Sequence, residues 1–159
     1  MFKNLTNPIA VQNYAKAISD MRKFKRILRN DKESDKQNAR TFAKITHSAP
    51  CFVLNEAIVQ IKQFDNMIPM IVGSMNYCTD LTQDIAIFLS LRAISDMSRS
   101  ILEENEGTIE SWYANIANFI GQLLRKHFKI DLAGIFVFIC SKLSSDEDMD
   151  IINILLLNE

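Results

Sequence analysis

The sequence predicts an all-α protein of about eight helices, forming a single helical domain over residues 1–159. Only 4 Gly and 3 Pro occur in 159 residues, whereas sheet proteins need turn-forming residues at each strand connection. Apolar residues recur three and four positions apart along most of the chain, which is the period of a helix. The composition, 48% hydrophobic and 23% charged, is typical of a globular protein and excludes a disordered or collagen-like chain.

Capping signals define the first two helices. Asn7 followed by Pro8 is a typical helix start, and the apolar spacing continues to about Arg29. The polar segment NDKE then forms a turn. Ser34 can cap a second helix, which is expected to end near Ser48.

Proline and aspartate mark the next three helices. Pro50 restarts the chain as a third helix, and Pro69 lies in the first turn of a fourth that ends near Tyr77. Asp80 is expected to cap the fifth helix. Apolar side chains cover nearly every face of this fifth helix, which predicts a central position in the domain. These side chains are Leu81, Ile85, Phe88, Leu89, Leu91 and Ile94.

Three more helices complete the prediction. Thr108 starts an amphipathic sixth helix, in which Gly121 is expected to permit a close helix contact. Asp131 caps a seventh helix, whose run IFVFIC is also compatible with a buried strand, although a single apolar face favours a helix. That face is expected to comprise Leu132, Ile135, Phe136, Ile139 and Leu143. Ser144 and Glu147 form a capping box that starts the last helix.

The short connections between these helices predict four antiparallel pairs, which is the unit of an α-solenoid. A compact helical bundle is the alternative, because the pairs show no sequence similarity to one another. The chain ends directly after the apolar run ILLL. We interpret this ending as that of a segment of a larger scaffold protein.

Charge is unevenly distributed along the chain. Residues 1–44 carry 11 Lys and Arg against 4 Asp and Glu, whereas the remainder is acidic, and the net charge is −1. The basic residues form one row on each of the first two helices, at three- and four-residue spacing. Such a surface suits RNA phosphates or an acidic protein, although it is also compatible with a solvated face. No aromatic residue interrupts the rows, so base stacking is not indicated. The candidate surface comprises Arg22, Lys23, Arg26, Arg29, Lys36, Arg40 and Lys44.

Catalytic and metal-binding motifs are not found. The glycines form no phosphate-binding loop, and the three widely spaced cysteines predict a reducing compartment rather than a disulfide framework. His47 and His127 belong to no metal motif, and His127 is expected to place a cation at a helix C-terminus. A cysteine enzyme using Cys51 and His47 is a weaker alternative, because Pro50 interrupts the segment between them. We therefore expect no enzyme activity, no cofactor and no metal.

Two stretches carry a combination of motifs found in a known family. KITHSAP, QIKQFDNMI and SMNYCT lie in order within residues 39–86, and ESWYANIANFIGQLLRKHFKIDLAG spans residues 110–134. Together these motifs resemble the middle region of the large scaffold subunit of the THO complex, although Gly73 and Cys78 depart from the family pattern. We interpret the matching residues as mainly structural. They include His47, Pro50, Gln60, Asp65, Asn66, Tyr77, Trp112, Gly121, Asp131 and Gly134.

The resemblance has consequences for fold and function. It implies an α-solenoid segment similar to MIF4G and HEAT folds, without catalysis of its own. It also implies a nuclear scaffold of the THO and TREX assemblies, acting in mRNP assembly and mRNA export. The implied partners are other THO subunits and the DEAD-box RNA helicase of TREX, with no membrane and no small-molecule substrate. An RNA-binding module using the basic N-terminal helices is the alternative function.

Overall fold

The computed structural model describes residues 7–30, 35–104, 111–127 and 130–144 of the chain. These residues form α-helices and short 3₁₀ turns, and no strand occurs among them. The all-α prediction is therefore confirmed, and the run IFVFIC is helical. The elements are α1 (Pro8–Asn30), α2 (Asp35–Ser48), α3 (Pro50–Gln63), η1 (Asp65–Met67), α4 (Ile68–Ser74), η2 (Met75–Tyr77), α5 (Asp80–Glu104), α6 (Ser111–Lys126) and α7 (Ala133–Ser144).

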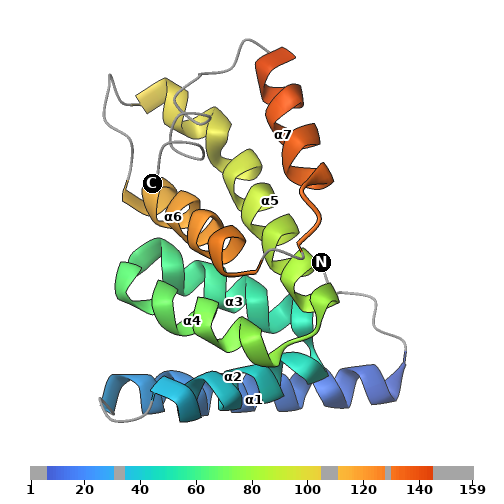
Figure 1. Ribbon diagram of the computed structural model, residues 1–159. Coiled ribbons are helices and arrows are strands. Elements are labelled where there is room, and N and C mark those ends of the chain that lie inside the picture. Colours follow the sequence, from blue (N-terminus) through green and yellow to red (C-terminus); the bar gives the residue numbers. More distant parts are fainter. Residues whose placement is uncertain (1–6, 31–34, 105–110, 128–129, 145–159) are drawn as a thin grey trace.

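The helices lie in layers (Figure 1). α1 and α2 lie side by side and form one outer layer, and α3 and α4 cover its inner face. α5 and α6 follow on the other side of α3 and α4, and α7 lies beside α5 at the far end.

The prediction that consecutive helices pack as pairs is met by α1 and α2. By contrast, α3 packs against α5 and α6, and α4 packs against α2 and α6. The starts predicted at Ser34 and Thr108, and the last helix predicted after Ser144, lie outside the described residues.

Local capping explains where several helices begin. The Asn7 side chain accepts a hydrogen bond from the Ile9 backbone N–H at 2.9 Å. Asp131 accepts one from the Ala133 N–H at 2.9 Å. The predicted cap at Asn7 is therefore confirmed, whereas Asp131 bonds the first turn of α7 from one residue before the capping position, which is Leu132. The prediction for Asp80 is wrong, because Thr79 occupies the capping position of α5. The Thr79 carbonyl and hydroxyl oxygens both face the Thr82 N–H, at 2.9 and 3.4 Å.

The core runs through all the layers. Phe24 of α1 packs on Phe42 of α2 with ring centroids 5.5 Å apart. The rings of Tyr14 of α1 and Phe52 of α3 pack edge to face, with their centroids 4.8 Å apart. This contact joins the outer layer to the next one. The largest fully buried side chains are Phe24, Phe42, Leu54, Ile61, Ile68, Ile71, Met75, Ile94, Ile116, Phe119, Ile120 and Leu123.

Three expectations about apolar faces are corrected by the packing. α5 is not enclosed on all sides, because Leu81 and Phe88 are exposed. α7 turns Ile135 inward and leaves Phe136 exposed, since it packs mainly against the single helix α5 and so buries a narrow face. Gly121 makes no close helix contact, because a methyl group built at its Cα meets nothing within 4 Å.

Candidate interaction surface

A row of basic side chains follows the outer face of α2. Lys36, Arg40 and Lys44 are all exposed, and successive members lie one helical turn, about 6 Å, apart. None of the three pairs with a carboxylate among the described residues. Their charges are therefore available to an anionic ligand.

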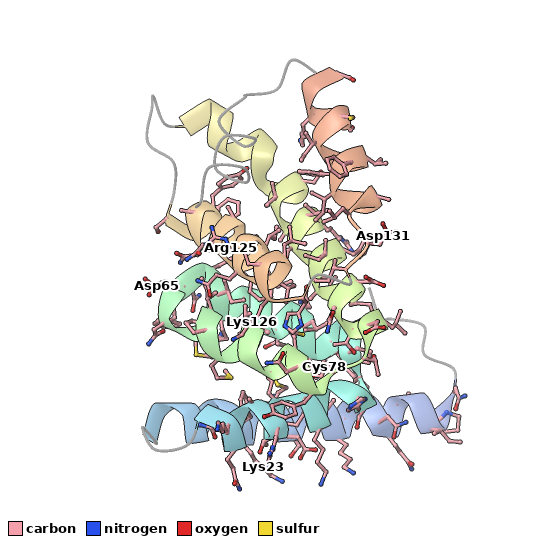
Figure 2. All side chains as sticks on the ribbon, in the orientation of Figure 1. Lys23, Asp65, Cys78, Arg125, Lys126 and Asp131 are labelled. Carbon is pink, nitrogen blue, oxygen red and sulfur yellow. The ribbon has the colours of Figure 1, made fainter. Side chains whose placement is uncertain are left out.

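The second predicted row lies on α1, in the same outer layer. Arg22 and Lys23 are exposed, and Lys23 points away from the other layers (Figure 2). Lys23 forms an exposed ion pair with Asp20 at 3.8 Å, which solvent weakens. Arg26 and Arg29 also belong to α1, but their side chains lie outside the described set.

An exposed aromatic ring joins the α2 row. The Arg40 guanidinium carbon lies 5.4 Å from the centroid of the Tyr77 ring, within the range of a cation–π contact. Tyr77 comes from η2 and keeps 41% of its surface exposed. No aromatic lies within the rows themselves, but Tyr77 is brought beside Arg40 from another element. Tyr77 lies more than thirty positions further along the sequence, so only the packing of η2 on α2 brings it there.

Buried hydrogen bonds hold the turn that carries Tyr77. The Gln83 side-chain amide donates to the Met75 carbonyl at 3.3 Å and lies 3.5 Å from His127 Nδ1. His127 Nε2 in turn lies 3.3 Å from the Val72 carbonyl. With Nε2 as donor, Nδ1 is the acceptor for Gln83. His127 lies at the C-terminal end of α6, as predicted, but its side chain is buried. It is a buried link between α4, α5 and the end of α6.

The alternative Cys51–His47 dyad does not form. Both side chains are exposed, and no hydrogen bond joins them. Ala49 between them has φ −155° and ψ 69°, so α2 ends before α3 starts and helical spacing is lost. No group of three or more His, Cys, Asp or Glu side chains suited to a metal occurs in the part of the chain that the structure describes.

The remaining motif residues are dispersed over the fold. The Lys62 ammonium nitrogen of α3 lies 4.8 Å from the centroid of the Trp112 ring of α6. The Asn115 side-chain amide of α6 donates a hydrogen bond to the Ile61 carbonyl of α3 at 3.2 Å. These contacts join α3 to α6. The motif residues Asp65, Asn66, Asp131 and Gly134 are exposed, and Gln60 is half-buried. They do not converge on one site, and the mainly structural role stays a prediction.

Burial perturbs two ionisable groups away from the basic surface. It raises the pKa of the half-buried Cys78 thiol to about 11, because the thiolate would lose solvation. The same cause raises the pKa of Tyr113 well above its usual range. The Tyr113 hydroxyl is buried and has no hydrogen-bond partner among the residues that the structure describes.

Exposed apolar side chains form a feature that the sequence prediction missed. Leu81 and Phe88 of α5 are 65% and 61% exposed, and Phe136 and Val137 of α7 are 61% and 69% exposed. The periodicity had assigned Phe136 to the interior. Apolar residues of this size on neighbouring helices are typical of protein contact surfaces. Within the described helices, none is long and apolar enough to cross a membrane.

Comparison with known proteins shows one consistent similarity. Residues 42–117 match the family model Thoc2, described as a transcription- and export-related complex subunit. Over 121 residues, or 76% of this chain, the sequence is 30% identical to THO complex subunit 2 of Homo sapiens. It is 27% identical to THO complex subunit 2 of Arabidopsis thaliana over 146 residues, or 92% of this chain. The chain spans 8% of the length of each of these two relatives.

Proposed function

Because this chain belongs to the Thoc2 family, as a region related to part of THO complex subunit 2, we propose that it is a non-enzymatic scaffold within THO. The similarity over most of the chain is the observation that carries this proposal. The dispersion of the motif residues over the fold supports it, since they do not gather into a reaction centre. In this proposal the chain acts in the nucleus, within TREX, during mRNP assembly and mRNA export.

We propose that α5 and α7 supply the protein contact. Phe136 and Val137 share the outward face of α7, on which the neighbouring exposed residue Cys140 is also uncharged. Buried apolar and aromatic anchors provide most of the free energy of protein association. The proposed occupant is another THO subunit, whose apolar residues would cover this face.

The test is binding of the full chain to purified THO subunits. The double substitution Phe136→Ser with Val137→Ser is expected to weaken binding at least tenfold, because hot-spot side chains typically contribute about 2 kcal/mol or more. Val59→Ser, at an exposed apolar position of α3, is the matched control and should bind as the wild type does. Failure of the wild-type chain to bind any THO subunit would refute the scaffold proposal.

A helicase partner is the finer part of the proposal. We infer that an α-solenoid segment of this kind docks and activates the DEAD-box RNA helicase of TREX. The measurement is the RNA-dependent ATPase rate of that helicase with and without the chain. Stimulation that depends on the chain's concentration would support activation. Binding to THO subunits without any change in ATPase rate would limit the function to assembly.

A second candidate function is RNA binding by the basic outer layer. The observation that favours it is the row of cations on α2, Lys36, Arg40 and Lys44, which pair with no carboxylate in the described part of the chain. Phosphate contacts release counterions, so the affinity should fall steeply as salt rises. Wild-type binding that does not change with salt would refute this function.

A further inference from the structure

We propose that Tyr77 and the α2 row form a binding site specific for single-stranded RNA, in which an unpaired base stacks on the Tyr77–Arg40 pair. The site, named here the Arg40–Tyr77 face, comprises Lys36, Arg40 and Lys44 of α2 and Tyr77 of η2. The inference rests on the proposed RNA binding of the outer layer and specifies its ligand. It adds base stacking to a surface whose sequence indicates only charge.

Arg40 and Tyr77 form an exposed pair of planar groups between two lysines. The Arg40 guanidinium lies 5.4 Å from the centroid of the Tyr77 ring, while 41% of the Tyr77 surface stays exposed. A guanidinium and a phenol ring are both planar groups on which nucleobases stack. The pair therefore offers an exposed stacking platform. Lys36 and Lys44 lie one turn of α2 on either side of Arg40, about 6 Å away along the helix, where they can contact flanking phosphates.

The η2 turn that carries Tyr77 is fixed by hydrogen bonds. η2 is held from behind by the bond from Gln83 to the Met75 carbonyl and by the contact of Gln83 with His127. The Cys78 N–H also bonds the Met75 carbonyl at 3.1 Å. A ring on a turn fixed in this way loses little conformational entropy when a base stacks on it. The buried network therefore positions a binding residue without contacting the ligand.

The chemistry of the Arg40–Tyr77 face favours one class of anionic ligand. The carboxylates of an acidic peptide would contact the three cations but not the ring. The bases of double-stranded RNA are stacked inside the helix, and its deep, narrow major groove keeps side chains from them. A single strand can present both an unstacked base and its phosphates. The combination of an exposed aromatic ring with neighbouring exposed cations thus favours single-stranded RNA.

The experiment measures binding of fluorescein-labelled oligouridylate to the full chain by fluorescence anisotropy. Tyr77→Leu is expected to weaken binding by about 5- to 100-fold, the effect of removing one base-stacking contact. Tyr77→Phe retains the ring and should bind within about threefold of wild type. Phe64→Leu removes another exposed aromatic, away from the α2 row, and should have no effect. Circular dichroism of each variant confirms folding.

Two further arms separate charge from stacking. Replacing Lys36 and Lys44 by Ala should lower the slope of log affinity against log salt by about 1.4, since each phosphate contact on a single strand contributes about 0.7. Arg125→Ala with Lys126→Ala, at the exposed end of α6 (Figure 2), is the control and should leave the slope unchanged. An RNA duplex should bind more weakly than the single strand.

The outcomes distinguish this inference from the function on which it rests. Salt-dependent binding of wild type that is unaffected by Tyr77→Leu would leave RNA binding intact and overturn the stacking site. Equal affinity for duplex and single strand would also overturn it, as would full displacement of the oligonucleotide by polyglutamate at equal charge. Absence of any RNA binding by the wild-type chain would overturn both.

Discussion

Replacing Gly121 by Ala is expected to stabilise the protein. Gly121 lies inside α6, where a glycine loses more backbone entropy on folding than an alanine would. A Cβ built on Gly121 meets no heavy atom within 4 Å. The substitution therefore gains helix propensity without a steric cost, and the expected gain is about 0.8–1 kcal/mol.

Chemical and thermal unfolding can measure this gain. In urea, the midpoint should rise while the m-value stays constant, because the surface exposed on unfolding does not change. The melting temperature should rise by roughly 2–4 °C for a chain of this size. Ala114→Gly, at an exposed position of the same helix, is the matched control and should lose about the same free energy. If Gly121→Ala instead destabilised the protein, a neighbouring helix would have to approach this position closely, and the reasoning from open space would be refuted.

Three further predictions concern buried or capping groups. Tyr113→Phe should stabilise the fold by about 1 kcal/mol, because it removes a buried hydroxyl without a partner; a loss of stability in urea would reveal a hidden partner. Thr79→Ala should cost about 1 kcal/mol by removing the cap of α5, and an unchanged urea midpoint would contradict that role. The raised pKa of Cys78, about 11, means that the native state retains this proton more tightly than the unfolded chain. Stability should therefore fall as pH rises from about 9 towards 11. Cys78→Ala should reduce that loss of stability. The same shift predicts an order of alkylation: iodoacetamide at neutral pH should modify the exposed Cys51 before Cys78, which mass spectrometry can check.

Helix boundaries follow from local chemistry, and for this reason much of the fold was predictable. Asn7 with Pro8 starts α1, and Pro50 starts α3, because these residues satisfy or dispense with the free N–H groups of a first turn. The start of α5 was placed one residue late. Thr79 and Asp80 are both acceptable caps by type, and only the backbone geometry shows which side chain faces the Thr82 N–H.

The candidate surface was predictable in part. The spacing of Lys36, Arg40 and Lys44 predicts one exposed row on α2, and the structure confirms that all three are exposed. The contact between Arg40 and Tyr77 could not be predicted, because it joins elements separated by more than thirty positions. His127 likewise looked like a terminal cation until the packing placed it against Val72 and Gln83.

The sequence by itself determined the helical class, most helix boundaries and the basic character of the N-terminal region, because periodicity, caps and charge act over a few neighbouring residues. Its motifs also indicated the family, which the comparisons then confirmed. Tertiary structure alone decided which apolar faces stay open. Phe136 and Ile135 are adjacent and equally apolar, yet α5 covers only Ile135. Periodicity states that a helix has an apolar face, whereas the number and direction of its neighbours decide how much of that face is buried.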